Sequence, residues 1–202
     1  YLDLFAGPGE ALVDLKALVA TSPQMALEVP DRFDQYIFVD TDAGYCEGLR
    51  GRVKQAKAEL STTVLHGDCN AMVKEILRSM PRPSQSFSVL SLCLVDPYKM
   101  SSLSFQTIEA LAAFRMDFLV LVPTFMDAHR NVRPYSRPES HTIARFTGAP
   151  DWRNRWIAAP YYEDFGLFVL DEMNRSMERI GFLPTGRHDA HRGLRGCLDA
   201  RA

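Results

Sequence analysis

The chain opens with an apolar run that holds one acid and breaks into a glycine turn, YLDLFAGPG at residues 1–9. Glycines at 7 and 9 would let the backbone approach a ligand closely where the next helix begins. Four more short apolar runs follow, separated by stretches with helical patterns. Near-continuous apolar strands that alternate with helices predict a parallel sheet covered on both faces. We therefore expect an α/β fold: a doubly wound, mostly parallel, Rossmann-like sheet with helices on both faces.

The sequence pattern gives provisional bounds for most elements. The predicted strands are residues 1–5, 35–40, 63–66, 87–95 and 117–122. The predicted helices are residues 10–20, 23–29, 43–59, 70–79, 104–114 and 163–180. No element is assigned to residues 124–160, which are rich in arginine, proline and aromatic residues, or to the tail 185–202. We expect residues 1–125 to form a Rossmann-like core and residues 126–202 to complete the same domain.

Composition excludes several classes of protein. The 202 residues are 47% hydrophobic and 24% charged, which is typical of a soluble globular domain. A net charge of −2 provides no overall basic field, so a nucleic-acid partner would need a local basic patch. The four cysteines form no C-x-x-C pair, and neither they nor the histidines predict a metal site or a disulfide framework.

The chain also gives expectations about its cellular setting. No stretch reaches the roughly 20 apolar residues of a membrane span, and no signal-peptide pattern is visible. A cytoplasmic protein without membrane contact is therefore expected. Because the chain begins inside a predicted strand and without methionine, we expect it to be a fragment.

Acids gather where the predicted strands end, and ligands of open parallel sheets bind beyond those ends. Asp40, Asp68 and Asp96 follow three of the five strands. A dinucleotide fingerprint would require glycine or alanine where Leu12 stands, and the Lys-Ser/Thr pair of a P-loop is missing. Asp3, inside the first strand, suits a cationic group such as an α-amino group better than a diphosphate. Asp40 is placed to accept hydrogen bonds from two ribose hydroxyls.

This ordered set resembles the S-adenosylmethionine (SAM) site of class I methyltransferases, and by that resemblance residues 1–125 would be a SAM-binding core. The resemblance implies that Asp40 binds the ribose. It places the following residues around the methionine moiety: Asp3, Phe5, Gly7 and Gly9. It also implies that Asp68 and Cys69 border the adenine. The alternative is an α/β fold with ordinary turn glycines and solvated acids.

The turn Asp96-Pro97-Tyr98 follows the fourth predicted strand. It resembles the Asp/Asn-Pro-Pro-aromatic turn of amino-methyltransferases, in which the acid accepts a hydrogen bond from the target NH₂ and the aromatic ring stacks on a base. By this resemblance Asp96, Pro97 and Tyr98 are catalytic residues. Only one proline is present here, and the alternative is a capped turn between a strand and a helix.

The chain as a whole resembles the three-Cys-motif partner protein family (TcmP), a methyltransferase-like group. The segments that carry the resemblance are YLDLFAGPG (1–9), SPQMALE (22–28), YIFVDTD (36–42), HGDCN (66–70), VDPY (95–98) and VPTFMDAHRN (122–131). The resemblance implies a partner protein that bears a three-cysteine motif. Lys99 stands where members have glycine, and at the pocket rim it would alter substrate access. Members also end in strands that complete the sheet, which residues 185–202 do not predict.

Four polar residues follow the fifth predicted strand and are expected near the pocket rim. His129 would serve as a general base, and Arg130 with Asn131 would bind a substrate phosphate or carboxylate. The alternative is a structural Asp127–Arg130 pair at a helix start. Six arginines lie between residues 130 and 155, among aromatic residues, as in nucleic-acid-binding surfaces. Trp152 and Trp156, four residues apart, are expected to pack in the core.

These observations predict a SAM-dependent methyltransferase-like protein that methylates a nitrogen acceptor, with nucleic acid as the first substrate class to test. A second hypothesis is a catalytically silent SAM-binding subunit that acts with the three-cysteine-motif protein. A third is a nucleotide-handling enzyme that uses its acids for metal-assisted hydrolysis.

Overall fold

The computed structural model describes residues 1–14, 16–159 and 164–184. The chain forms two compact units, residues 1–123 and 124–202, which divide close to the boundary expected after residue 125. That residues 126–202 complete the same domain stays a prediction. The predicted tail 185–202 lies outside the described residues.

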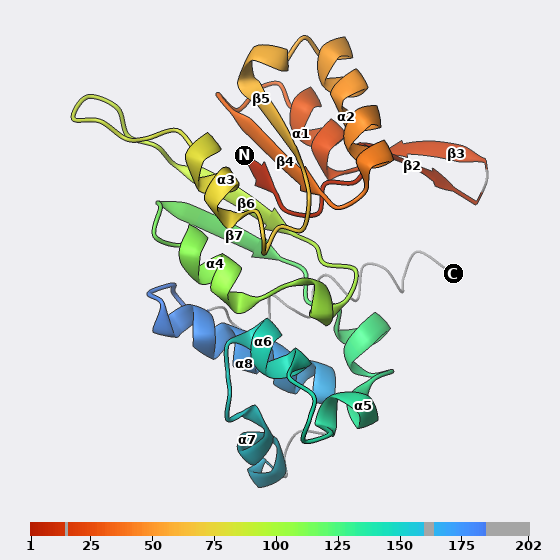
Figure 1. The fold of residues 1–202 in the computed structure, drawn as a ribbon, viewed down its shortest axis with the longest axis vertical. Coiled ribbons are helices and arrows are strands. Elements are labelled where there is room, and N and C mark those ends of the chain that lie inside the picture. Colours follow the sequence, from red (N-terminus) through yellow and green to blue (C-terminus); the bar gives the residue numbers. More distant parts are fainter. Residues whose placement is uncertain (15, 160–163, 185–202) are drawn as a thin grey trace. The chain divides into compact units, whose positions relative to one another are not determined.

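The first unit is built on a five-stranded parallel sheet with the order β5-β4-β1-β6-β7 (Figure 1). The strands are β1 Leu2–Asp3, β4 Tyr36–Asp40, β5 Thr62–His66, β6 Ser91–Val95 and β7 Met116–Val120. The order reverses between β1 and β6, as in doubly wound sheets. This topology confirms the expected fold class.

Helices cover both faces of this sheet. They are α1 Ser22–Glu28, α2 Ala43–Gln55, α3 Val73–Ser79 and α4 Phe105–Leu111. Helices α1 and α2 lie on one face and α3 and α4 on the other (Figure 1), as right-handed crossovers require once the strand order reverses. Residues 36–39 of β4 are fully buried, which explains their unbroken apolar sequence. Phe38 and Leu49 belong to the core between β4 and the α1–α2 layer.

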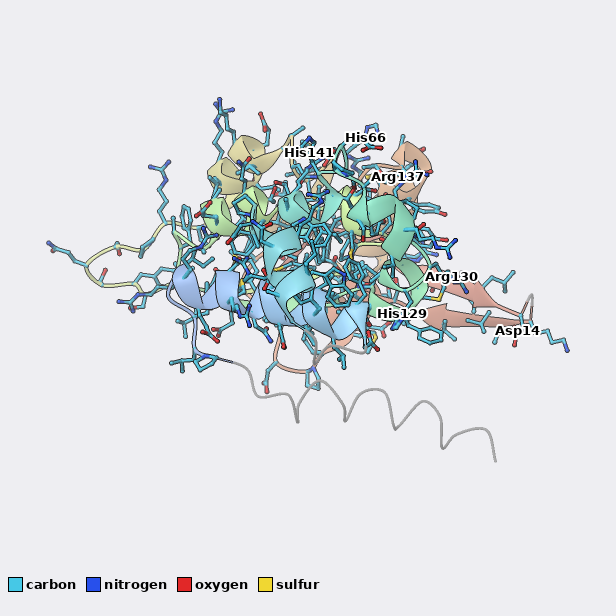
Figure 2. The ribbon with its side chains drawn as sticks, turned by 90° about the horizontal axis from the view of Figure 1, so that it is seen from below. Asp14, His66, His129, Arg130, Arg137 and His141 are labelled. Atoms are coloured by element: carbon cyan, nitrogen blue, oxygen red, sulfur yellow. The ribbon has the colours of Figure 1, made fainter. Side chains whose placement is uncertain are left out.

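One predicted helix is wrong: residues 10–20 form a β-hairpin. Its strands are β2 Glu10–Val13 and β3 Ala17–Ala20. Asp14 adopts a left-handed φ of 50°, which aspartate tolerates, and the Lys16 N–H donates to the Val13 carbonyl at 3.0 Å. Figure 2 shows Asp14 at the tip of the hairpin. The turn overrides the helical propensity of the alanines and leucines around it, because such propensities are weak.

Several other boundaries differ from the prediction for local reasons. Strand β1 ends at Asp3, whose carboxylate accepts the Phe5 N–H at 3.2 Å and so bends the chain. Strand β6 begins at Ser91 rather than at residue 87, because Ser84 and Phe87 pair across a tight turn. The predicted helix 70–79 begins at Val73, after a turn closed by Asp68.

The second unit, as far as the structure describes it, is helical. A π-helical turn spans Thr124–Ala128, and the helices are α5 Val132–Ser136, α6 Thr142–Thr147, α7 Trp152–Ala158 and α8 Phe165–Arg179. Helix α8 was expected from its pattern, whereas α5, α6 and α7 fall in the segment that was left unassigned. Trp152 is fully buried, with its ring centroid 5.8 Å from that of Phe165. The expected burial is thus confirmed for Trp152. Trp156 is half-buried, with its ring centroid 5.0 Å from that of Phe168.

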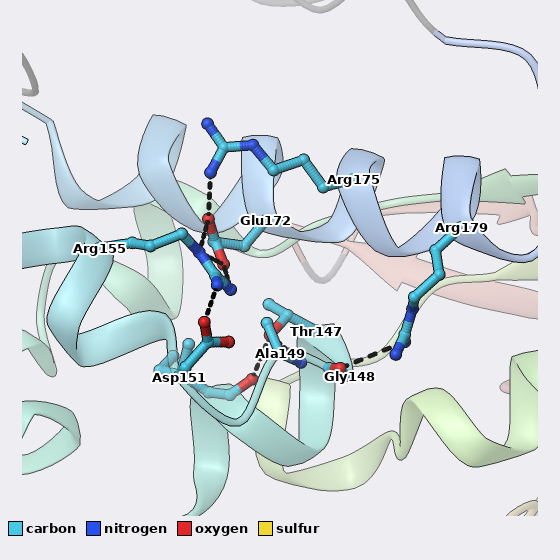
Figure 3. Close-up of polar contacts among 9 residues, drawn as sticks. Thr147, Gly148, Ala149, Asp151, Arg155, Glu172, Arg175 and Arg179 are labelled. Atoms are coloured by element: carbon cyan, nitrogen blue, oxygen red, sulfur yellow. Dashed lines mark hydrogen bonds and ion pairs between the residues drawn. The ribbon is translucent and has the colours of Figure 1, made fainter.

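A buried carboxylate ties α7 to α8 (Figure 3). Glu172 of α8 has no exposed side-chain surface. Its oxygens accept hydrogen bonds from Arg155 Nε at 3.0 and 3.1 Å and from Arg175 Nη1 at 2.7 Å. Arg155 also pairs with Asp151 one turn earlier on α7. Arg155, one of the six arginines between residues 130 and 155, is therefore held by ion pairs within the second unit.

Candidate functional site

An open cleft of about 650 Å³ lies in the first unit, at the carboxyl ends of β1 and β6. This is the point where the strand order reverses, which is the usual ligand site of doubly wound sheets. Its lining comes from the glycine turn, the hairpin, the start of α1, the first turn of α2 and the ends of β6 and β7. The lining residues are Phe5, Ala6, Gly7, Pro8, Glu10, Ala11, Leu12, Thr21, Ser22, Tyr45, Leu94, Asp96 and Leu121.

The glycine turn is held in a left-handed conformation. Gly7 has φ 62° and Gly9 has φ 90°, values that residues with a Cβ adopt only under strain. A Cβ on Gly9 would come within 2.9 Å of Arg52 Cδ, so glycine also makes room for this arginine. Arg52 pairs with Glu10, which joins the base of the hairpin to α2. Gly7 and Pro8 line the cleft, whereas Gly9 lies behind them.

Asp40, at the end of β4, supports the glycine turn. Its Oδ2 accepts the Gly7 N–H at 2.8 Å, and its Oδ1 accepts the Asp42 N–H at 2.8 Å. A carboxylate offers about four lone-pair positions, so both oxygens can accept further hydrogen bonds. Asp40 therefore lies beside the cleft, next to Gly7, with accepting capacity left.

Asp3 is fully buried, and Ser22, which lines the cleft, covers it. Its carboxylate accepts hydrogen bonds from Ser22 Oγ at 2.6 Å, from Phe5 N at 3.2 Å and from Tyr1 OH at 3.4 Å. Burial raises the pKa of Asp3 to about 6, although the three hydrogen bonds act in the opposite direction. The structure thus places Asp3 beneath the cleft rather than among its lining residues.

Asp96 lines the cleft at the end of β6 and is exposed. Within the described residues it has no hydrogen-bond partner, and partial burial raises its pKa. Pro97 is buried behind it. Tyr98 is 87% exposed and Lys99 is exposed, and neither lines the cleft. Of the predicted catalytic turn, the structure brings Asp96 alone into contact with the cleft.

Asp68 and Cys69 follow β5 and do not line the cleft. Asp68 is exposed, and its Oδ1 accepts the backbone N–H and the side-chain amide of Asn70, at 2.8 and 2.7 Å. Cys69 is buried. Asn70 in turn donates to the Ser102 carbonyl at 2.8 Å and anchors the start of α4. These contacts give the segment a structural role in joining β5 to α4.

The charge of the cleft restricts its ligand. Glu10 and Asp96 line it, while Asp40 and Asp3 lie directly behind its wall. No lysine, arginine or histidine is among the lining residues, and the nearby Arg52 is paired with Glu10. Such a site disfavours phosphates and favours a ligand with positive charge.

Sequence reasoning missed several lining residues. Tyr45 is half-exposed in the first turn of α2 and presents an aromatic ring to the cleft. Ser22 contacts Asp3, and Leu12 contributes an apolar side chain from the hairpin. The sequence did carry a signal for Tyr45, because this aromatic residue lies in the first turn of the helix that follows Asp40 at the end of β4. Leu12 had none, since a helix was expected there.

The polar residues after β7 belong to the second unit, so their expected place near the pocket rim stays a prediction. His129 Nε2 lies 2.9 Å from Oδ1 and 3.0 Å from Oδ2 of Asp164, the N-cap residue of α8. Asn131 donates to the buried Asp127 at 2.7 Å, as does the Tyr135 hydroxyl. Burial and this neighbouring carboxylate raise the pKa of Tyr135. Arg130 is exposed and, among the described residues, pairs neither with Asp127 nor with another acid.

The described residues show neither a metal-binding cluster nor a membrane-spanning helix. Residues 1–14, 16–159 and 164–184 contain no group of three or more His, Cys, Asp or Glu side chains placed to hold a metal ion. None of the helices in these ranges combines the length and the apolar character needed to cross a membrane.

Comparisons with known proteins give little. No family model matches the chain, and no curated protein matches it significantly. One solved structure, described as a conserved hypothetical protein of Streptococcus pyogenes, aligns with 63% of this chain and 72% of its own, at 21% sequence identity and a TM-score of 0.37. At this level the similarity identifies neither a family nor a ligand.

Proposed function

We propose that the cleft binds SAM and that the protein transfers the methyl group of SAM to a nitrogen acceptor. The observation that carries the proposal is an acidic cleft without cationic lining residues, built around a left-handed glycine turn at the switch point of a doubly wound sheet. SAM carries two positive charges, on its sulfonium and its ammonium group, and one negative carboxylate, so its net charge is +1. Phosphate-bearing nucleotides would meet Asp96 and Asp40 unfavourably, whereas the charge of Glu10 is offset by Arg52.

The residues of the cleft fit the parts of this cofactor. Asp40 has accepting capacity for ribose hydroxyls beside Gly7. Tyr45 and Leu12 offer an aromatic and an apolar surface to the adenine. Ser22, backed by the buried Asp3, offers a hydroxyl oxygen to an ammonium group. Asp68 and Cys69, assigned to the adenine by the resemblance, do not line the cleft and are not part of this proposal.

Asp96 is the residue of this chain best placed to act on the acceptor. SAM, when bound, supplies an electrophilic methyl group. Asp96 accepts a hydrogen bond from the acceptor N–H, which orients the nitrogen lone pair toward the cleft. Because partial burial raises the pKa of Asp96, its carboxylate is a stronger base than that of an ordinary aspartate. The same group can therefore take the proton that the methylated nitrogen releases, while S-adenosylhomocysteine is the leaving group.

Isothermal titration of SAM and S-adenosylhomocysteine into the whole chain tests binding. We expect both to bind, and Asp40→Ala to weaken both by roughly 10- to 100-fold, because it removes hydrogen bonds to a charged acceptor. Asp117→Ala is the matched control, since this exposed acid lies near the opposite end of β7. If the folded wild-type chain binds neither compound, the proposal is refuted.

Transfer is tested separately. Asp96→Ala should abolish methyl transfer to amine-bearing acceptors while SAM still binds. If this variant transfers methyl groups at the wild-type rate, Asp96 does not have the role assigned to it.

One observation favours a second candidate, a catalytically silent SAM-binding subunit that acts with a three-cysteine-motif protein. Tyr98, the aromatic residue that should stack on an acceptor base, is 87% exposed and lies outside the cleft lining. A silent subunit would bind SAM and release no S-adenosylhomocysteine with any acceptor. Turnover by the purified chain would exclude this candidate.

A further inference from the structure

We infer that the second unit binds single-stranded nucleic acid through exposed arginines between residues 130 and 145. The inference rests on the proposed function in one respect: the single strand would be the polymer that carries the nitrogen acceptor. The surface concerned consists of Arg130, Arg133, Arg137 and Arg145, and it is called the arginine surface below.

Burial and pairing separate these four arginines from the other two in the segment. Arg155 is held by Glu172, and Arg153 donates to backbone carbonyls while its guanidinium lies 4.6 Å from the Trp152 ring centroid. The four residues of the arginine surface are exposed, and the described residues offer them no ion pair. Asp127 and Glu139 are the only acids between residues 124 and 145, and Asp127 is buried. The exposed charge of this segment is therefore strongly positive.

The backbone that carries this surface has a fixed shape. Arg153 Nη2 donates to the carbonyls of Arg137 at 2.6 Å and Tyr135 at 3.4 Å, and also to that of Ser140. One guanidinium thus joins the end of α5 to the turn before α6. On α6 the Arg145 N–H donates to the His141 carbonyl at 2.9 Å, so these two residues lie one turn apart. Figure 2 labels Arg130, Arg137 and His141 on this unit.

A stacking group accompanies the charges. In the π-helical turn, Asp127 and Ala128 are buried while Phe125 and Met126 are 69% and 59% exposed. The His129 ring meets the Phe125 ring edge-on at 5.9 Å. Arginines and an exposed aromatic ring together are what proteins use for single strands: phosphate contacts along the backbone and stacking on the bases. The exposed ring favours a single strand over an acidic peptide, because every base offers it a face for stacking.

The expected salt dependence follows from the number of arginines. Each phosphate contact to a single strand contributes a slope of about −0.7 in log affinity against log salt concentration. Removing three arginines should therefore reduce the slope by about 2. At 0.1 M salt the same three contacts account for a loss of affinity of roughly 100-fold.

The test measures fluorescence anisotropy of labelled 20-nucleotide single-stranded RNA and DNA with the whole chain, and the two probes decide which polymer binds more tightly. We expect the triple variant Arg133→Ala, Arg137→Ala and Arg145→Ala to lose roughly 10- to 100-fold in affinity, with the smaller slope. Lys54→Ala, Lys74→Ala and Arg82→Ala together are the matched control, because these residues are exposed on the first unit and their replacement removes the same charge. Phe125→Ala should weaken binding roughly 5- to 100-fold at an unchanged slope.

Three outcomes would overturn the inference: full binding by the arginine triple variant, an equal loss in the control, or equally tight binding of a labelled poly-glutamate peptide. The last outcome would instead indicate an acidic protein partner. Titration of SAM into the same samples keeps the two proposals apart. A wild-type chain that binds SAM but neither oligonucleotide overturns this inference alone, whereas a wild-type chain that binds an oligonucleotide but not SAM overturns the proposed function alone.

Discussion

Replacing Glu172 by alanine removes the buried carboxylate that Arg155 and Arg175 share, and leaves Arg155 with Asp151 as its acidic partner. Breaking a buried ion pair by removing one partner costs about 3–5 kcal/mol. Here the side chains of Arg155 and Arg175 are 35% and 54% exposed, so water can solvate them once the carboxylate is gone. This places the loss near the lower end of that range, at about 3 kcal/mol in the free energy of unfolding of the second unit.

Urea unfolding followed by tryptophan fluorescence measures this loss cleanly. Both tryptophans of the chain, Trp152 and Trp156, lie in α7, so their emission reports the second unit and not the first. With a slope of about 1–3 kcal/mol per molar urea, the midpoint should fall by roughly 1–3 M. Glu178→Ala is the matched control on α8, because Glu178 is exposed. A change in Glu172→Ala no larger than in this control would refute the reasoning.

Three further predictions concern the cleft. Burial raises the pKa of Asp3 from 3.8 to about 6, so the folded chain holds this proton more tightly than the unfolded chain. The free energy of unfolding should therefore fall by up to about 3 kcal/mol as the pH rises from about 4 to 6. Asp3→Asn should remove this pH dependence in urea titrations, and parallel profiles of the variant and the wild-type chain would contradict the prediction. Gly9→Ala should lower the free energy of unfolding by about 1–3 kcal/mol, because alanine is strained at a φ of 90°. Gly51→Ala should raise the free energy of unfolding by about 0.5–1 kcal/mol, because Gly51 lies in α2 with open space around it. Thermal melts of both variants measure these changes. Asp96→Asn should weaken SAM binding by about 1 kcal/mol, roughly fivefold, in calorimetry, because it removes an attraction to the sulfonium charge. S-adenosylhomocysteine, a net-neutral zwitterion without the sulfonium charge, should be unaffected. Equal effects on both compounds would contradict a charge-based role.

The parallel sheet was predictable because its strands are buried on both faces and therefore read as unbroken apolar runs. Residues 36–39 are the best example, since all four are buried. The hairpin was not predicted because two alanine- and leucine-rich runs resemble one helix. A usable signal was present in retrospect: the triplet ALV occurs at residues 11–13 and again at 17–19, on either side of Asp14 and Lys16.

The site was predictable where it depends on strand ends and not where it depends on loops. Phe5, Gly7 and Asp96 are brought together in one cleft because the carboxyl ends of β1 and β6 are neighbours. Asp68 follows β5, two strands away from β1, and it closes a local turn instead of reaching the cleft. The spacing of residues along the chain does not indicate which strand ends are neighbours, because the order of the strands in the sheet decides this.

The hairpin has a practical consequence for handling this protein. Among the residues that the structure describes, each of its strands pairs only with the other, so both outer edges carry backbone groups free for pairing. Leu12 and Leu18 are 57% and 64% exposed, and the charges that normally blunt such edges are confined to the two ends of the hairpin. Open apolar edges are templates for strand addition between molecules. Threonine at position 18 would keep the β-propensity while lowering the hydrophobicity and would leave Leu12, which lines the cleft, unchanged. This substitution is therefore the first choice for limiting strand addition between molecules.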